Sequence, residues 1–132
     1  MPNVLQKIVS STLVNATVVT TAETQILYSG RVSIPFATIR AVIKAWIQMS
    51  AGTAATGIRV QVRRGNGVAG TLLGSTLATT VVAGNIVELS YRINEQLSGF
   101  EGQDYSVTVT QVAATGNGTV QQAQIEVEMI NG

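Results

Sequence analysis

Hydrophobic and polar side chains alternate along four stretches of this sequence, and glycine-rich segments separate several of them. The stretches cover residues 57–63, 86–93, 105–110 and 122–129. Successive side chains of a β-strand point to opposite faces, so a period of two gives each stretch one apolar and one polar face. Strands with one solvated face are typical of antiparallel sheets. The pattern therefore predicts an antiparallel β protein.

Weaker strand signals fill most of the remaining chain. Residues 12–21, 24–29 and 72–82 are rich in β-branched side chains, and the last of these is interrupted at Gly74. Residues 38–49 have a helix-favouring composition, but their apolar side chains share one face only if the segment is extended. We therefore predict an all-β fold, an antiparallel β-sandwich of about eight strands and of jelly-roll type.

The segments between these strands have turn chemistry. Residues 64–67 and 83–85 combine glycine and asparagine, which tolerate a positive φ. Residues 115–118 have the same composition between two strong strands, and we expect them to form a hairpin loop. The longest polar connection covers residues 94–104.

Chain length predicts a single domain. With 132 residues and a mass of 13.8 kDa, the chain can bury about two thirds of its surface without disulfides or metals. Residues 11–132 are expected to form one β-sandwich domain. Residues 1–10 form either an N-terminal arm that contacts a neighbouring subunit or an edge strand. If they form an arm, their removal weakens assembly without unfolding the domain.

Two residue types with central catalytic roles are absent. The sequence has no histidine and no cysteine, which excludes serine–histidine and cysteine–histidine nucleophiles and thiolate metal sites. The glycines of residues 64–70 lie between strands, without the helix that a phosphate-binding loop needs. We expect no enzymatic activity, no cofactor and no structural metal.

The remaining candidates for chemistry are carboxylates. Glu126 and Glu128 share one face of a predicted strand, and Glu101 and Asp104 lie in the same loop, where calcium is an alternative. Solvated surface positions explain both pairs better. If the last strand neighbours residues 57–63, Arg59 faces Glu126 or Glu128. The net charge of +1 and the scarcity of aromatic residues argue against a nucleic-acid partner.

Low charge favours a protein partner. Charged residues make up 11% of the chain, against about 25% in typical domains, so few charges need desolvation in a contact. No apolar run has the length of a membrane span, and the N-terminal segment lacks the pattern of a secretory signal. An apolar arm and an apolar outer strand face provide the candidate subunit contacts, which are Val4, Leu5, Ile8, Val42 and Trp46.

Four segments of the sequence look familiar, namely residues 58–65, 70–74, 105–110 and 114–120. With these segments, roughly residues 25 to 130 resemble small jelly-roll structural proteins of bacterial viruses. The resemblance implies a non-enzymatic virion protein: a capsid, capsid-decoration or vertex subunit, or a fibre knob. It further implies a trimer or pentamer that contacts other virion proteins and is assembled in the host cytoplasm. No functional residue carries over, because the group has no shared catalytic motif.

A carbohydrate- or receptor-binding β-sandwich, from a phage fibre or a bacterial surface protein, is the alternative. Sugar sites use exposed aromatic side chains as platforms. Tyr91 and Tyr105 fall on the core-facing side of their predicted strands, which leaves Trp46 and Phe100 as candidate platforms.

Overall fold

The computed structural model describes residues 5–13, 16–31, 40–96, 103–112 and 118–131, and these residues form nine strands. No helix in this part of the chain has the length and apolarity to span a membrane. The strands are β1 (Leu5–Leu13), β2 (Thr17–Val18), β3 (Thr24–Tyr28), β4 (Arg40–Ser50), β5 (Thr56–Arg64), β6 (Leu72–Val81), β7 (Ile86–Gln96), β8 (Tyr105–Gln111) and β9 (Thr119–Asn131).

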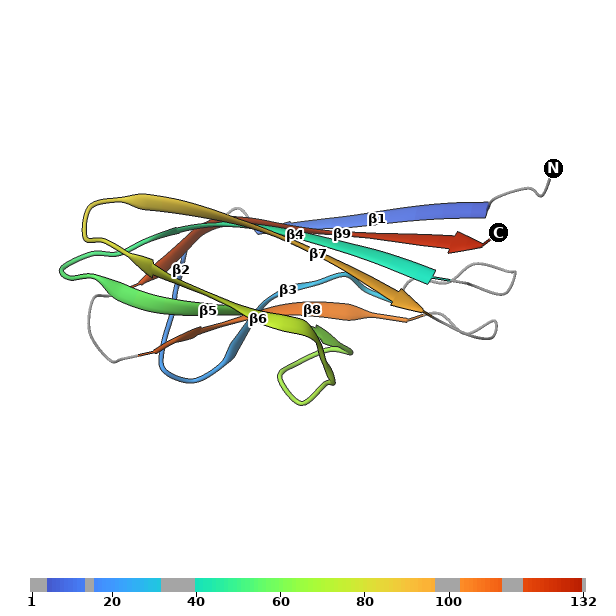
Figure 1. Cartoon of the computed structure of the whole chain (residues 1–132), viewed down its shortest axis with the longest axis horizontal. Coiled ribbons are helices and arrows are strands. Elements are labelled where there is room, and N and C mark those ends of the chain that lie inside the picture. Colours follow the sequence, from blue (N-terminus) through green and yellow to red (C-terminus); the bar gives the residue numbers. More distant parts are fainter. Residues whose placement is uncertain (1–4, 14–15, 32–39, 97–102, 113–117, 132) are drawn as a thin grey trace.

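Two antiparallel sheets form a sandwich (Figure 1). Sheet A has the order β1-β9-β4-β7, with the two-residue β2 also paired to β9, and sheet B has the order β3-β8-β5-β6. The pairs are nested along the chain, because β1 pairs with β9, β3 with β8, β4 with β7 and β5 with β6. A long nested hairpin rolled into two sheets is the jelly-roll arrangement. The predicted fold class is confirmed.

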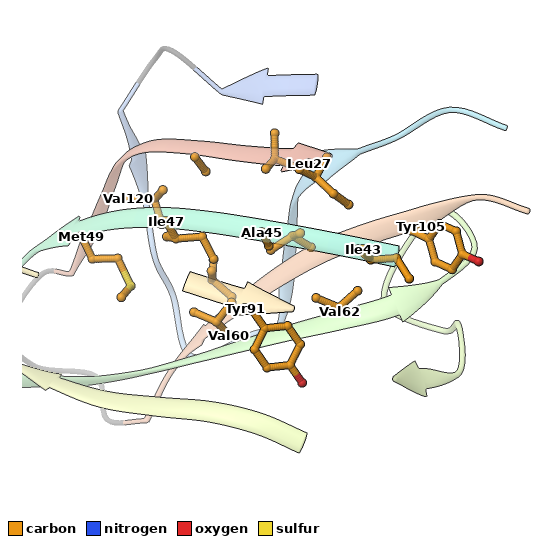
Figure 2. Close-up of a cluster of buried hydrophobic side chains, with 14 of the residues drawn as sticks. Leu27, Ile43, Ala45, Ile47, Met49, Val60, Val62, Tyr91, Tyr105 and Val120 are labelled. Carbon is orange, nitrogen blue, oxygen red and sulfur yellow. The ribbon is translucent and has the colours of Figure 1, made fainter. Parts of the chain in front are cut away.

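The core lies between the sheets and has contributions from both (Figure 2). The alternation seen in the sequence places the apolar face of each strand inside, as expected for period two. On β4, Ile43, Ile47 and Met49 are fully buried, and Val60 and Val62 of β5 face them from sheet B. The strand assignment of residues 38–49 is therefore confirmed for the described part, and Tyr91 and Tyr105 lie in the core as predicted.

Strand β8 departs from the expected pattern because both of its faces are buried. Ser106 and Thr108, predicted to face solvent, are 0% exposed. The turn that connects β5 to β6 lies against this outer face, where the Ser106 hydroxyl donates to the carbonyl of Gly65 at 2.8 Å. The same turn contacts β3, since the Gln25 amide donates to Asn66 at 2.9 Å. Hydrogen-bonding hydroxyls are suited to such a covered face.

Two local predictions were wrong. Residues 115–117 lie outside the described residues, but the strands on either side of them are not hairpin partners, because β8 belongs to sheet B and β9 to sheet A. The single strand expected over residues 12–21 is divided between the end of β1 and the short β2. Gly74 does not break its strand, because β6 continues from Leu72 to Val81, but it marks an irregularity where the register between β5 and β6 shifts and its φ is +65°.

Candidate interaction surfaces

A groove of about 350 Å³ lies beside Trp46 on the outer face of sheet A. Trp46 stands opposite Ser90 of β7 and Gln124 of β9 in the cross-strand register. Because the serine side chain is small, it leaves space beside the indole ring. The side chains that line the groove are Lys44, Trp46, Ser90, Arg92, Gln124 and Glu126.

The ionic partners in this groove differ from those predicted. Lys44, one cross-strand row away from Trp46, lies 3.9 Å from Glu126, and the two side chains are 50% and 36% exposed. Arg59 cannot face Glu126 or Glu128, because β5 lies in sheet B and β9 in sheet A. The conditional pairing inferred from the sequence was therefore wrong.

Four of the five predicted contact residues lie in sheet A, two on β4 and two on β1, and Ile8 and Val42 share a cross-strand row through Glu128. Trp46 is partly exposed in the groove, whereas Val42, on the same strand, is only 5% exposed and offers little area to a partner. Leu5 and Ile8 belong to β1, where they stand opposite Asn131 and Glu128 of β9. The first ten residues thus include the start of an edge strand. Val4 lies outside the described residues, as does Phe100.

A second surface lies at one end of the sandwich, and we call it the uncharged end. It comprises residues 16–22, 50–57, 80–86, 111–112 and 118–120, and Figure 1 shows β2 near the β4–β5 and β6–β7 connections. In sheet A, Val18, Thr119, Ser50 and Ile86 form one cross-strand row. Backbone pairing of Ala51 with Ala83 joins the two neighbouring connections.

Large apolar side chains project from the uncharged end, and none of its described residues is charged. Val18, Val82, Ile86 and Val112 are between 54% and 65% exposed. An open hollow of about 450 Å³ lies beside Val112. The exposed apolar side chains belong to both layers of the sandwich, because Val18 and Ile86 lie in sheet A and Val112 follows a strand of sheet B. This end therefore has the composition of an interface core.

Sequence reasoning missed the uncharged end although the sequence contains a signal for it. Residues 8–22, 45–58, 65–87 and 105–125 contain no charged residue. The connections between strands at this end fall within those uncharged runs. The one exception is Glu23, the last residue before β3. Only the fold reveals that the runs meet, because the connections are far apart along the chain.

A buried polar cluster closes the opposite end of the sandwich. The Tyr105 hydroxyl donates to Glu95 at 2.5 Å, and Arg64 donates to the other carboxylate oxygen. Burial raises the pKa of the Tyr105 hydroxyl, which keeps it protonated as a donor. Glu95 is 7% exposed and joins β7 of sheet A to two strands of sheet B. The cluster therefore satisfies a buried carboxylate and connects the sheets.

The carboxylates singled out in the sequence are separated or engaged. The Tyr28 hydroxyl donates to Asp104 at 2.6 Å, while Glu101 lies outside the described residues. Within the described ranges, no three acidic side chains come together as a metal site. Glu126 pairs with Lys44 on the outer face of sheet A.

Comparisons with known proteins show the fold but no family. No protein-family model matches the sequence, and no curated protein matches it. Among solved structures, a chain in the structure of the infectious bursal disease virus Gx strain aligns with 97% of this chain. The TM-score is 0.69 and the identity is 8%. The VP2 subviral particle of infectious bursal disease virus aligns with 96% at a TM-score of 0.66 and 8% identity.

This chain covers 33% of each of those viral chains. A similar fold also occurs in a larger protein, dimeric latent PorU from Porphyromonas gingivalis. It aligns with 99% of this chain at a TM-score of 0.57 and 10% identity, and the aligned part is 13% of the PorU chain. The chain is thus a jelly-roll β-sandwich of the kind found in viral capsid proteins. At these identities the likeness concerns the fold, which hosts several functions.

Proposed function

We propose that this protein is a non-enzymatic structural subunit of a virion, a capsid, capsid-decoration or vertex protein that assembles through the uncharged end. The observation that carries the proposal is that four large apolar side chains are more than half exposed at an end without described charges. The likeness of the fold to the two chains from infectious bursal disease virus supports it. In line with the sequence resemblance, the particle we infer is that of a bacterial virus.

The physical argument rests on desolvation. Burying apolar surface contributes about 25 cal/mol per Å², and an interface without charges avoids the cost of stripping water from ions. A stable interface needs about 800 Å² per subunit. Closed cyclic symmetry buries such a surface on every copy, and the resemblance to virion proteins favours a trimer or pentamer.

The proposal predicts that an acidic side chain at the uncharged end dissociates the oligomer. Ile86→Asp introduces a charge at a side chain that is 61% exposed in the single chain. Burying an unpaired carboxylate in the contact is costly, so the variant should become monomeric. The folded monomer should lose less than about 0.5 kcal/mol of stability, because the site is a surface position. Light scattering over a range of concentrations measures the mass.

Thr71→Asp is the matched control, because Thr71 is exposed near the opposite end, where its carbonyl accepts a hydrogen bond from the backbone NH of Arg64. This variant should keep the mass of the native oligomer. A native protein that stays monomeric at all concentrations would contradict self-assembly. An oligomer that survives Ile86→Asp would place the interface elsewhere.

Binding of a saccharide or a glycosylated receptor is the second candidate function. The specific observation in its favour is the groove beside Trp46, where an aromatic ring lies among polar side chains. Glycan screening of native protein and Trp46→Ala tests this function independently of assembly.

A further inference from the structure

Arg92 is a cation of the Trp46 groove that has no ion-pair partner among the described residues. Among the described residues, Lys44 has Glu126 as an ionic partner at 3.9 Å, whereas no acceptor lies within hydrogen-bond or ion-pair distance of Arg92. Arg92 stands opposite Lys44 in the register, one row from Trp46, and its side chain is exposed. The groove thus presents an aromatic ring and a free guanidinium side by side.

The other groove residues are suited to hydroxyl groups. Ser90 and Gln124 flank Trp46 on the two neighbouring strands and provide hydrogen-bond donors and acceptors. The apolar face of a pyranose ring packs on an indole, while its hydroxyls bond to such side chains. A guanidinium binds a carboxylate through two parallel hydrogen bonds. The volume of about 350 Å³ is at the lower end of the range for small-molecule sites, about 300–1,000 Å³.

We propose that this groove binds an acidic saccharide, with a uronic or sialic acid unit stacked on Trp46 and its carboxylate held by Arg92. The inference rests on the second candidate function and specifies its ligand class. It is compatible with assembly, because Trp46 lies four residues from Ser50 along β4, about 13 Å from the row at the uncharged end.

Intrinsic fluorescence reports directly on the site, because Trp46 is the single tryptophan of the chain. We would titrate the protein with trigalacturonic acid and with its methyl ester, which keeps the sugar rings and removes the charge. Sialyllactose and lactose form the second pair and distinguish a sialic acid from a uronic acid. We expect saturable changes in emission for one acidic ligand and at least about tenfold weaker binding of its neutral counterpart.

Variants assign the roles of the two side chains. Arg92→Gln should lower the affinity for the acidic ligand about tenfold or more and leave that for the neutral ligand unchanged. Arg59→Gln is the matched control, because Arg59 is an exposed arginine on sheet B, and it should bind like the native protein. Trp46→Ala, followed by calorimetry, should bind neither ligand.

Four outcomes would overturn the inference. They are no saturable signal up to about 10 mM of any of the four ligands, equal affinities within both pairs, unchanged binding by Arg92→Gln, and Trp46 emission that changes with protein concentration alone. The last outcome would identify this face as an interface between copies. The monomeric Ile86→Asp variant should bind the acidic ligand like the native protein. If the native protein forms the oligomer but binds none of the ligands, only the saccharide inference is contradicted. If the native protein binds the acidic ligand but stays monomeric, only the assembly proposal is contradicted.

Discussion

Arg63 makes three hydrogen bonds that hold the outer side of sheet B together. Its Nε and one terminal nitrogen donate to the two carboxylate oxygens of Glu23 at 2.6 and 2.8 Å. The other terminal nitrogen donates to the carbonyl of Gly70 at 2.8 Å. Both side chains of the pair are about four-fifths buried. Bidentate, partly buried geometry makes this pair worth more than an ordinary surface ion pair.

The pair predicts a pH-dependent contribution to stability. The Arg63 guanidinium lowers the pKa of Glu23 below its ordinary value of 4.5. Because the folded pKa is depressed, the stabilisation is complete above the unfolded value and is lost as the pH falls through the folded pKa. Glu23→Gln should therefore reduce the free energy of unfolding by about 1 kcal/mol near neutral pH. The difference from the native protein should shrink once the pH falls below about 4.5.

Urea unfolding followed by Trp46 emission, at several pH values from neutral to about 3, measures this difference. Arg63→Gln serves as the reciprocal variant, and adding it to Glu23→Gln should cost less than the two single effects combined. If the difference in unfolding free energy stays constant with pH, the interaction with Arg63 does not lower the pKa of Glu23 in the folded protein.

At the scale of elements, the sequence was informative wherever a strand has one solvated face. Strands β5, β7 and β9 were placed within a few residues, because their alternation is set by burial on one side only. The sequence could not show that the outer face of β8 is covered, since serine and threonine suit both solvent and a hydrogen-bonded contact. It also could not assign β8 and β9 to different sheets. A glycine–asparagine loop has the same local chemistry in a hairpin and in a crossover between sheets.

Gly74 tests the irregularity in the pairing of β5 and β6. A Cβ atom there would lie 2.9 Å from the Tyr91 hydroxyl, and the φ of +65° is unfavourable for any other residue. Gly74→Ala should destabilise the fold by about 2–3 kcal/mol. Gly84→Ala is the matched control, because its φ is +81° and nothing lies within 4 Å of the added atom.

Gly84→Ala should lower the free energy of unfolding only by the cost of holding alanine at a positive φ, about 1–2 kcal/mol. Thermal and urea unfolding of both variants measure the two costs. Equal costs would mean that the contact with Tyr91 is relieved by a small shift of that side chain.

Strand β1 provides the second test at this scale. Residues 5–10 each stand opposite a residue of β9, so their removal takes away most of the β1–β9 ladder and leaves residues 126–131 of β9 at the edge of the sheet. At about 1 kcal/mol for each hydrogen bond lost, deletion of residues 1–10 should lower the free energy of unfolding by a few kcal/mol. This is the edge-strand alternative of the two that the sequence left open, whereas removal of an arm would leave the domain intact. Deletion of residues 1–3 is the control, and unchanged unfolding of the longer deletion would favour the arm.

At the scale of the whole molecule, surfaces were harder to predict than the fold. Trp46 was found from the sequence because one large aromatic side chain on the polar face of a strand is conspicuous. Its neighbours Ser90 and Gln124 were not, because they belong to β7 and β9 and meet Trp46 only through the strand order of sheet A. The uncharged end required the same information. Its apolar side chains come from three parts of the chain, with Val82 and Ile86 on the two sides of one connection.

The composition of the uncharged end determines how assembly should respond to salt. The net charge is only +1, and no described residue at this end is charged, so screening has no ion pair to weaken there. We expect the oligomer mass to stay constant between about 0.05 and 0.5 M sodium chloride. Dissociation should be suppressed by ammonium sulfate, which strengthens the burial of apolar surface. Light scattering on diluted samples across both salts distinguishes the mechanisms. An oligomer that dissociates in sodium chloride would show that charged groups, such as those on the outer face of sheet A, form the contact instead.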